Sequence, residues 1–385
     1  MSTSTTREIV RRKRKEYLKS RKAAKRSILD ELEELTGYHR KSLVRMFVEG
    51  VPKKNTQIRR PRSNKYEPIL PQLRVLWASA FCACGKRLAP FMPELLRVMK
   101  RDGEIEVTAG EERLLKGISA ATIDRMLDSD RAAMSVRGRT TTKPGTLLRS
   151  KIRVRTFAEW DEQEPGFFEI DLVAHCGGSG SGEFLYTLNM TDVFSGWIAP
   201  GGMKGRGKAG TVLAIKSASS QLPFRVKGID SDNDSAFINH HLAKYCAKEK
   251  ILPTRSRPYK KNDQCHVEQK NWTVVRRFIG YRRFETDEEL AAIKEVYPVI
   301  MRYHNFFSPM MKLMEKERNG SKVTKHYSEP MTPHQRLLVD KRIDEATKKR
   351  LNEEYESLNP AALLRQITAL LRKLQAAADR AAQTD

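Results

Sequence analysis

The sequence predicts a multidomain protein in which all-α domains precede an α/β domain and a C-terminal region that ends in a helix. Apolar residues recur at helical spacing before about residue 131, and after about residue 161 short apolar runs alternate with helical patterns. The 385 residues are enough for two or three domains with buried cores. Their 72 Lys and Arg exceed the 47 Asp and Glu, and the net charge of +25 favours a polyanionic partner.

The first predicted unit, residues 1–50, combines a basic arm with a helix-turn-helix. An apolar stripe that ends at Leu35 predicts one helix, Gly37 predicts a turn, and the spacing of Leu43 and Phe47 predicts a second helix. A plain helical hairpin is the alternative. In a helix-turn-helix the second helix enters the major groove of DNA. We therefore expect three side chains of this helix to contact DNA: Arg40, Lys41 and Arg45.

Two basic linkers flank a second predicted helical unit. Residues 51–65 are rich in cations and contain two prolines, so they cannot build a core and would suit an arm that follows a DNA groove. Residues 66–131 form the second unit, which resembles another helix-turn-helix and ends in a helix capped by Ser119. Residues 132–160 are again polar and basic. The DNA contacts expected in the first linker and the second unit are Lys53, Lys54, Arg59, Arg60, Thr122 and Arg125.

Residues 161–285 predict a ribonuclease H-like α/β domain. Three apolar strands that can pair antiparallel are followed by alternating helices and strands, which is the order of that fold. The ends of its first and fourth strands meet, and this brings Asp171 and Asp232 together. The expected elements are strands at 167–175, 183–190 and 195–202, a helix at 207–221, a strand at 224–231, a helix at 239–250, a strand at 251–255 and a helix that carries Glu268.

Two further regions follow the α/β domain. Residues 286–342 form a post-core segment, and residues 343–385 form a helical region. From Leu363 to Leu374 apolar residues recur every three or four positions, which predicts a helix with an apolar stripe. Packing of this stripe onto the core and pairing with another subunit both remain open.

Three carboxylates form the candidate catalytic and metal site: Asp171, Asp232 and Glu268. Asp171 lies inside an apolar run, and a buried carboxylate is costly unless it is paired or binds a metal. Asp232 and Glu268 are separated by 35 residues. Carboxylates from separate elements can hold two Mg²⁺ or Mn²⁺ ions about 3.5–4 Å apart, which activate the attacking oxygen and stabilise the leaving oxygen of a phosphodiester. The alternative is that the two aspartates cap turns and Glu268 is a solvated helix residue.

The chain resembles a bacterial insertion-sequence transposase with a retroviral-integrase-type catalytic core. The carboxylates have the spacing of the DDE motif, and Ser-Asp-Asn-Asp-Ser-Ala-Phe at 231–237 looks like the family's (Thr/Ser)-Asp-Asn-Gly-x-(Glu/Ala)-Phe. Val-Glu-Gln-Lys-Asn at 267–271 and Met-Thr-Asp-Val-Phe-Ser-Gly-Trp at 190–197 also match, and the resemblance covers about residues 150–340. Asp234 stands where Gly is usual, so Asp230 and Asp234 stay alternatives to Asp232, the aspartate directly before Asn.

The resemblance implies a DNA transposase that binds the terminal inverted repeats of its element, cleaves one strand to free 3′-hydroxyl ends and joins them to target DNA. It also implies a homo-oligomer, a dimer or larger, on paired DNA ends, with two Mg²⁺ or Mn²⁺ ions per active site. Lys270 and Arg276 closely follow Glu268 and are expected to hold DNA beside the site. Two alternatives stay open: a catalytically silent DNA-binding regulator with an integrase fold, and a nuclease that does not join the ends.

Cysteine usage and hydropathy bear on the compartment. The five cysteines form no CxxC pair, and the sequence shows neither a secretory signal nor a long apolar stretch. We therefore expect a reducing bacterial cytoplasm, association with the nucleoid and no membrane span. The adjacent His and Cys at 175–176 and 265–266 lack a second spaced pair, so zinc is not expected.

Overall fold

The computed structural model describes residues 3–50, 64–133, 153–155, 164–256, 264–319 and 322–384. The chain divides into two compact units, Met1–Asn64 and Lys65–Asp385, and each is described by itself. Among the described residues, no helix is long and apolar enough to cross a membrane.

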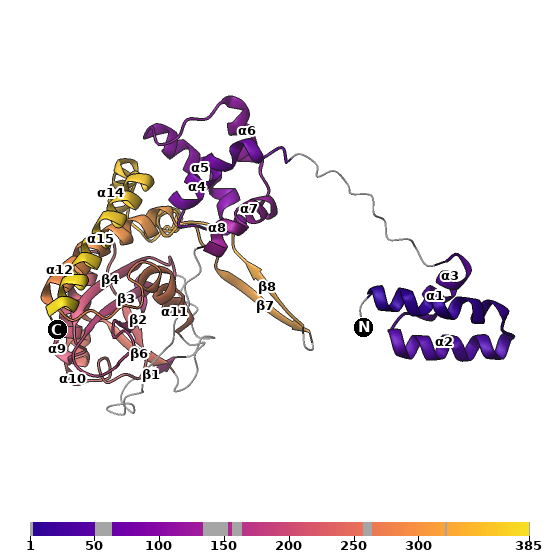
Figure 1. Ribbon diagram of the computed structural model, residues 1–385. Coiled ribbons are helices and arrows are strands. Elements are labelled where there is room, and N and C mark those ends of the chain that lie inside the picture. The colour runs from indigo at the N-terminus through magenta and orange to yellow at the C-terminus, as the bar shows by residue number, and fades with distance from the viewer. Residues whose placement is uncertain are drawn as a thin grey trace. The chain divides into compact units, whose positions relative to one another are not determined.

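The N-terminal unit is a three-helix cluster of α1 (Thr3–Lys19), α2 (Lys22–Thr36) and α3 (Arg40–Val48) (Figure 1). The predicted turn is confirmed, because Gly37 ends α2 with a φ of 70°, a left-handed conformation that suits glycine. The prediction of a basic arm is wrong, because its residues form α1. The buried Tyr17 of α1 stacks on Phe47 with ring centroids 4.3 Å apart. Leu35, which was expected in the apolar stripe, is 49% exposed.

The second unit begins with short helices around a buried apolar cluster. The predicted cap is confirmed, since Ser119 Oγ accepts a hydrogen bond from the backbone N–H of Thr122 at 3.3 Å. The apolar cluster of these helices continues into that of the α/β domain, so residues 66–131 lie in the same compact unit as the core. The helices are η1 (Glu67–Ile69), α4 (Leu70–Ser79), α5 (Gly85–Arg101), α6 (Ala109–Gly117), α7 (Ala120–Met126) and α8 (Asp128–Ala133).

The predicted ribonuclease H-like domain is confirmed. Its sheet has the order β1-β6-β5-β2-β3-β4, in which β2, β3 and β4 pair antiparallel and β2, β5, β6 and β1 run parallel. Strand β1 at the edge was not expected, because it falls in the predicted linker. The strands are β1 (Arg153–Arg155), β2 (Phe167–Ala174), β3 (Leu185–Asp192), β4 (Ile198–Lys204), β5 (Gly228–Ser231) and β6 (Leu252–Ser256).

Helices cover both faces of this sheet. Phe168 and Ile170 of β2 belong to the apolar cluster that contains residues of α9 (Lys208–Ser219) and α10 (His240–Glu249). Val173, which points to the other face of β2, belongs to the cluster that contains α12 (Asp287–Phe307). The face with Val173 also carries Asp171, so the candidate site lies on the α12 side of the sheet.

The C-terminal region packs back onto its own unit. Helix α15 (Pro360–Thr384) buries Ile367 and Leu374 in the cluster that it shares with α12, so part of its leucine stripe packs onto the core. The hairpin of β7 (Leu313–Asn319) and β8 (Lys322–Tyr327) projects from the unit (Figure 1). Between the hairpin and α15 lie α13 (Pro333–Val339) and α14 (Glu345–Ser357).

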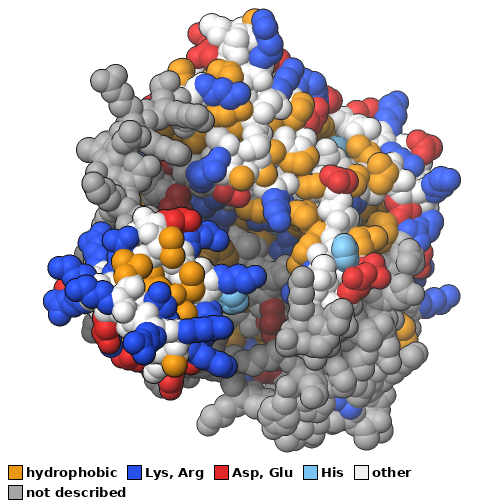
Figure 2. Space-filling model, turned by 90° about the vertical axis from the view of Figure 1, so that its right-hand side faces the viewer, with side chains coloured by type: hydrophobic (Ala, Val, Ile, Leu, Met, Phe, Trp, Pro, Cys, Tyr) orange, Lys and Arg blue, Asp and Glu red, His pale blue; other side chains and the backbone are white. Residues whose placement is uncertain are grey.

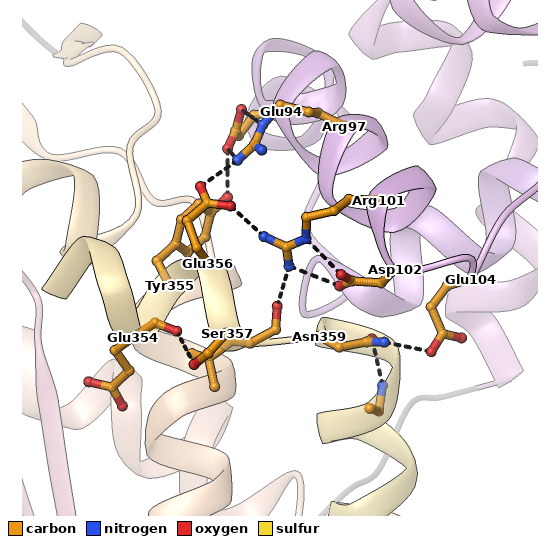
Figure 3. Close-up of polar contacts among 12 residues, drawn as sticks. Glu94, Arg97, Arg101, Asp102, Glu104, Glu354, Tyr355, Glu356, Ser357 and Asn359 are labelled. Atoms are coloured by element: carbon orange, nitrogen blue, oxygen red, sulfur yellow. Dashed lines mark hydrogen bonds and ion pairs between the residues drawn. The ribbon is translucent and has the colours of Figure 1, made fainter. Parts of the chain in front are cut away.

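Polar contacts fix the N-terminal helices of this unit to the C-terminal helices (Figure 3). The Arg101 guanidinium of α5 donates to the Glu356 carboxylate at 2.6 Å, and Arg97 donates to the same carboxylate at 3.0 Å. The Tyr355 hydroxyl donates to the Glu94 carboxylate at 2.8 Å. These contacts join segments that are more than 250 residues apart.

Candidate active site

Adjacent strands bring Asp171 and Asp232 together. Strands β2 and β5 are parallel, and their register places Ile170 opposite Ser231. Asp171 and Asp232 each follow this pair directly, and both side chains are partly exposed. The adjacency that was predicted from the strand order is therefore present at the end of β5.

Asp171 carries the strongest electrostatic signal of the three. Its carboxylate accepts hydrogen bonds from the Leu172 N–H at 2.8 Å and from Asn271 Nδ2 at 2.5 Å. Desolvation, the Asp232 carboxylate and, less strongly, the Glu268 carboxylate raise the pKa of Asp171 to about 7. Asp171 thus lies in an electric field to which both of the other candidate carboxylates contribute.

The turn after β5 distinguishes the three aspartates of this segment. Asp232 Oδ1 accepts the Asp234 N–H at 2.8 Å, and desolvation raises the pKa of Asp232 to about 6. Asp234 is engaged in the turn, because it accepts the Ala236 N–H at 2.8 Å and pairs with Arg206 at 3.1 Å. Asp230 is buried and accepts the Thr254 hydroxyl at 2.6 Å. These contacts favour Asp232 over its two neighbours.

Glu268 comes from a helix that changes its winding. It lies in α11 (Cys265–Lys270), which continues as the π-helix η4 (Asn271–Arg276), and its side chain is exposed. Val274 and Val275 of η4 are buried and anchor this segment. Asn271, at the start of η4, donates to Asp171, so the segment is tied directly to β2. A π-helical turn that interrupts an α-helix is frequent at functional sites.

Glu169 is a site residue that the sequence analysis missed. Two residues before Asp171, it shares that residue's face of β2, and it is fully buried beside Asp230. Its Oε2 accepts the Val267 N–H at 2.8 Å, so it holds the start of the helix that carries Glu268. Desolvation raises the pKa of Glu169 well above its ordinary value. Two acidic residues at alternate positions of an apolar strand were the available signal.

The donor set fits a hard divalent cation. Three carboxylates supply the oxygen ligands that such a cation prefers. The raised pKa values of Asp171 and Asp232 mean that their ionised forms are destabilised where they lie, and a bound cation would offset this. Among the described residues, no group of three or more His, Cys, Asp and Glu side chains is already arranged to hold a metal ion.

The two basic residues expected beside the site have partners inside the protein. Lys270 Nζ lies 2.9 Å from His304 Nε2, and its side chain is only partly exposed. The Arg276 guanidinium donates to the Ala174 carbonyl at 2.9 Å and lies over the Tyr281 ring. DNA could replace these contacts only at the cost of breaking them.

Some of the side chains expected to contact DNA from the helical units are exposed, and others are already bonded within the protein. Lys41 and Arg45 are exposed on α3, whereas Arg40 is bonded to Asp30 and to the Arg26 carbonyl. On α7, Arg125 is exposed and donates to the Thr122 hydroxyl at 3.1 Å. Four expected contacts lie outside the described residues: Lys53, Lys54, Arg59 and Arg60.

Sequence comparison gives two matches. The family model "Integrase core domain" matches residues 161–261. The uncharacterized protein y4rM of Sinorhizobium fredii is 37% identical over 334 residues, which are 86% of this chain and 95% of y4rM. The second match is therefore far longer than the match to the family model.

Comparison with solved structures gives retroviral integrases. The HTLV-2 integrase catalytic core domain in complex with magnesium is 17% identical, with a TM-score of 0.29 over 38% of this chain and 90% of that chain. The BIV integrase catalytic core domain is 15% identical, with a TM-score of 0.29 over 49% and 98%. The simian T-cell lymphotropic virus intasome in complex with PP2A regulatory subunit B56 gamma is 15% identical, with a TM-score of 0.31 over 56% and 69%. At TM-scores this low, the likenesses do not strengthen the fold assignment, which depends on the strand order and the family match.

Proposed function

The chain belongs to the family of integrase core proteins that includes y4rM, and we propose that it is a DNA transposase of the DDE type. An integrase core implies a polynucleotidyl transferase. In our proposal the protein binds the terminal inverted repeats of its element, frees 3′-hydroxyl ends and joins them to target DNA. The observation that carries this proposal is the position of Asp171, whose carboxylate is influenced by those of Asp232 and Glu268.

In this proposal the three carboxylates hold two Mg²⁺ or Mn²⁺ ions. When bound, such ions activate the attacking oxygen and stabilise the leaving oxygen of a phosphodiester. The chain's own residues orient the carboxylates: Asn271 fixes one oxygen of Asp171, and Glu169 fixes the start of the Glu268 helix.

Positive charge supports DNA as the partner. The net charge is +25, and Lys and Arg side chains are spread over the face shown in Figure 2. We assign base and phosphate contacts to exposed residues of α3 and α7, of which Lys41, Arg45 and Arg125 are available. We further propose that two or more copies act together on paired ends.

The triad is tested by three conservative variants: Asp171→Asn, Asp232→Asn and Glu268→Gln. Each should lower cleavage and joining of the element's end DNA by about a hundredfold or more, because a metal ligand is worth several kcal/mol. Binding of the same DNA, measured by fluorescence anisotropy, should stay unchanged, since the surfaces that read DNA are intact.

Asp234→Asn and Asp230→Asn are the matched controls from the same segment. Asp234→Asn should cleave like the wild type, because its carboxylate already serves the turn and Arg206. If any triad variant kept activity within about tenfold of wild type, that residue would not be a metal ligand. If Asp234 proved essential and Asp232 dispensable, the assignment at this turn would be wrong.

A further inference from the structure

Four basic side chains from four separate segments converge beside α11. We call them the basic cluster: Arg87 of α5, Lys270 of α11, Lys312 before β7, and Arg336 of α13.

Met310 and Ser328 link three members of the basic cluster. Lys270 Nζ lies 3.9 Å from Met310 Sδ, and the Arg336 guanidinium donates to the Met310 carbonyl at 2.7 Å. The Ser328 hydroxyl lies 3.4 Å from Arg336 Nη2 and accepts the backbone N–H of Lys312 at 3.0 Å. Burial, then Lys270 and Arg87, lower the pKa of His304, so Arg87 lies near the histidine that Lys270 contacts.

The basic cluster has no anionic partner among the described residues. Lys270 contacts a histidine nitrogen, Lys312 donates to the Phe194 carbonyl at 2.8 Å, and Arg336 donates to a carbonyl and a hydroxyl. None of the four cations is ion-paired to an Asp or Glu in the described ranges. The Arg336 Nε is buried there without a hydrogen-bond acceptor.

The convergence has an electrostatic cost. Burial lowers the pKa of Arg336 to about 10. Burial and Arg336 lower the pKa of Lys312 to about 8, while Asp192 acts in the opposite direction without reaching ion-pair distance. Ordinary surface lysines keep their ammonium groups in water and avoid this repulsion. A bound anion would supply the missing negative charge.

We propose that the basic cluster binds a phosphate of the DNA backbone and so holds a DNA strand against α11. Three of its members, Arg87, Lys270 and Lys312, are partly exposed. Lys270 is two positions from Glu268, so on a helix the two side chains leave α11 on different sides. The bound phosphate therefore belongs to DNA outside the reacting bond. This inference rests on the proposed function only in taking DNA as the polyanion.

The test compares Arg87→Gln and Lys312→Gln with Lys86→Gln in the full-length protein. Lys86 is the exposed neighbour of Arg87 on α5 and lies outside the basic cluster, so it controls for the loss of one charge. The probe is a labelled random-sequence duplex in EDTA, titrated by anisotropy between roughly 50 and 200 mM salt. Each cluster variant should weaken binding and reduce the slope of log K against log salt by about 0.9, whereas Lys86→Gln should not.

Thermal unfolding separates binding from a structural role. Without DNA, Arg87→Gln should unfold at the same temperature as wild type or higher, because repulsion is relieved. With DNA, it should gain less in unfolding temperature than wild type. If both cluster variants kept the wild-type slope, or unfolded earlier while keeping the full DNA-induced rise, the inference would be overturned.

Cleavage of end DNA is measured in parallel with Mg²⁺. If the wild type cleaves and the cluster variants bind DNA like Lys86→Gln, only the phosphate site is overturned. A wild type that binds no DNA would overturn both this inference and the proposed function. Glu268→Gln should keep the wild-type salt slope, since its carboxylate lies outside the basic cluster.

Discussion

At the scale of residues, Glu169 and Asp171 show how two carboxylates on one strand face take different tasks. Asp171 is partly exposed and lies near Asp232, whereas Glu169 is fully buried behind it. The Glu169 carboxylate accepts a backbone N–H at the start of α11. Burying a carboxylate is costly unless such bonds are made, so this contact indicates that Glu169 positions the helix that carries Glu268.

Two variants test the role of Glu169. Glu169→Ala leaves the Val267 N–H without its acceptor, which should cost about 1–3 kcal/mol of unfolding free energy and loosen the start of α11. Cleavage should fall while DNA binding stays unchanged. Glu169→Gln keeps an acceptor oxygen and should restore most of the cleavage rate. If Glu169→Gln were as inactive as Glu169→Ala, the charge and not the hydrogen bond would be what matters.

The candidate catalytic residues could be predicted from sequence, but their supporting contacts could not. Asp171, Asp232 and Glu268 are found by spacing and by the apolar context of the first. The bond from Val267 to Glu169 and the bond from Asn271 to Asp171 join residues about one hundred positions apart. Such pairs depend on how α11 and η4 pack on β2, and no local pattern records that.

At the scale of elements, a glycine fixes how closely α5 and α7 approach. Gly85 begins α5, and its N–H donates to Asp124 Oδ1 at 2.7 Å. A Cβ built at Gly85 would lie 2.0 Å from the carbonyl oxygen of Ala120. Because this neighbour is backbone at the start of another helix, it cannot move aside as a side-chain end could. The two helices can therefore pack in this way only if residue 85 has no side chain.

We expect Gly85→Ala to lower the free energy of unfolding by about 1–3 kcal/mol, because overpacking outweighs the better helix propensity of alanine. The matched control is Gly110→Ala in α6, where the nearest atom to an added Cβ is Thr108 Oγ1 at 3.9 Å. That control should be neutral or gain up to about 1 kcal/mol. Urea unfolding measures both. Equal stability of the two variants would contradict the close packing of α5 and α7.

Elements with a local apolar pattern were the predictable ones. Strands β2 to β6 and helices α9 and α10 lie within a few residues of their expected ranges, because alternation and turn residues mark them. Helix α1 was missed because most of its residues are charged or polar and only a few, such as Val10 and Tyr17, are buried. The β7–β8 hairpin was missed because most residues of both strands are polar or charged.

At the scale of the whole molecule, the helical segment 66–131 and the core share one apolar cluster. Phe81 of that segment packs against Tyr303 of α12, with ring centroids 5.2 Å apart. The Arg101–Glu356 pair joins α5 to α14. The basic linkers on either side predict a separate domain at 66–131, because composition marks linkers but does not show which apolar faces meet. Any DNA held by α7 is therefore held in the same compact unit as the candidate active site.

Sequencing the DNA products of the reaction tests the proposed transposase activity most directly. The full-length protein is incubated with its element's end DNA and a target duplex, with Mg²⁺ or with EDTA. We expect new 3′ ends at the element boundary and their junctions with target DNA, both only with the metal and both lost in Glu268→Gln. Cleavage in EDTA would contradict this expectation, and so would bound but uncut DNA in Mg²⁺, which would leave a DNA-binding regulator. Cut ends that are never joined would indicate a nuclease instead.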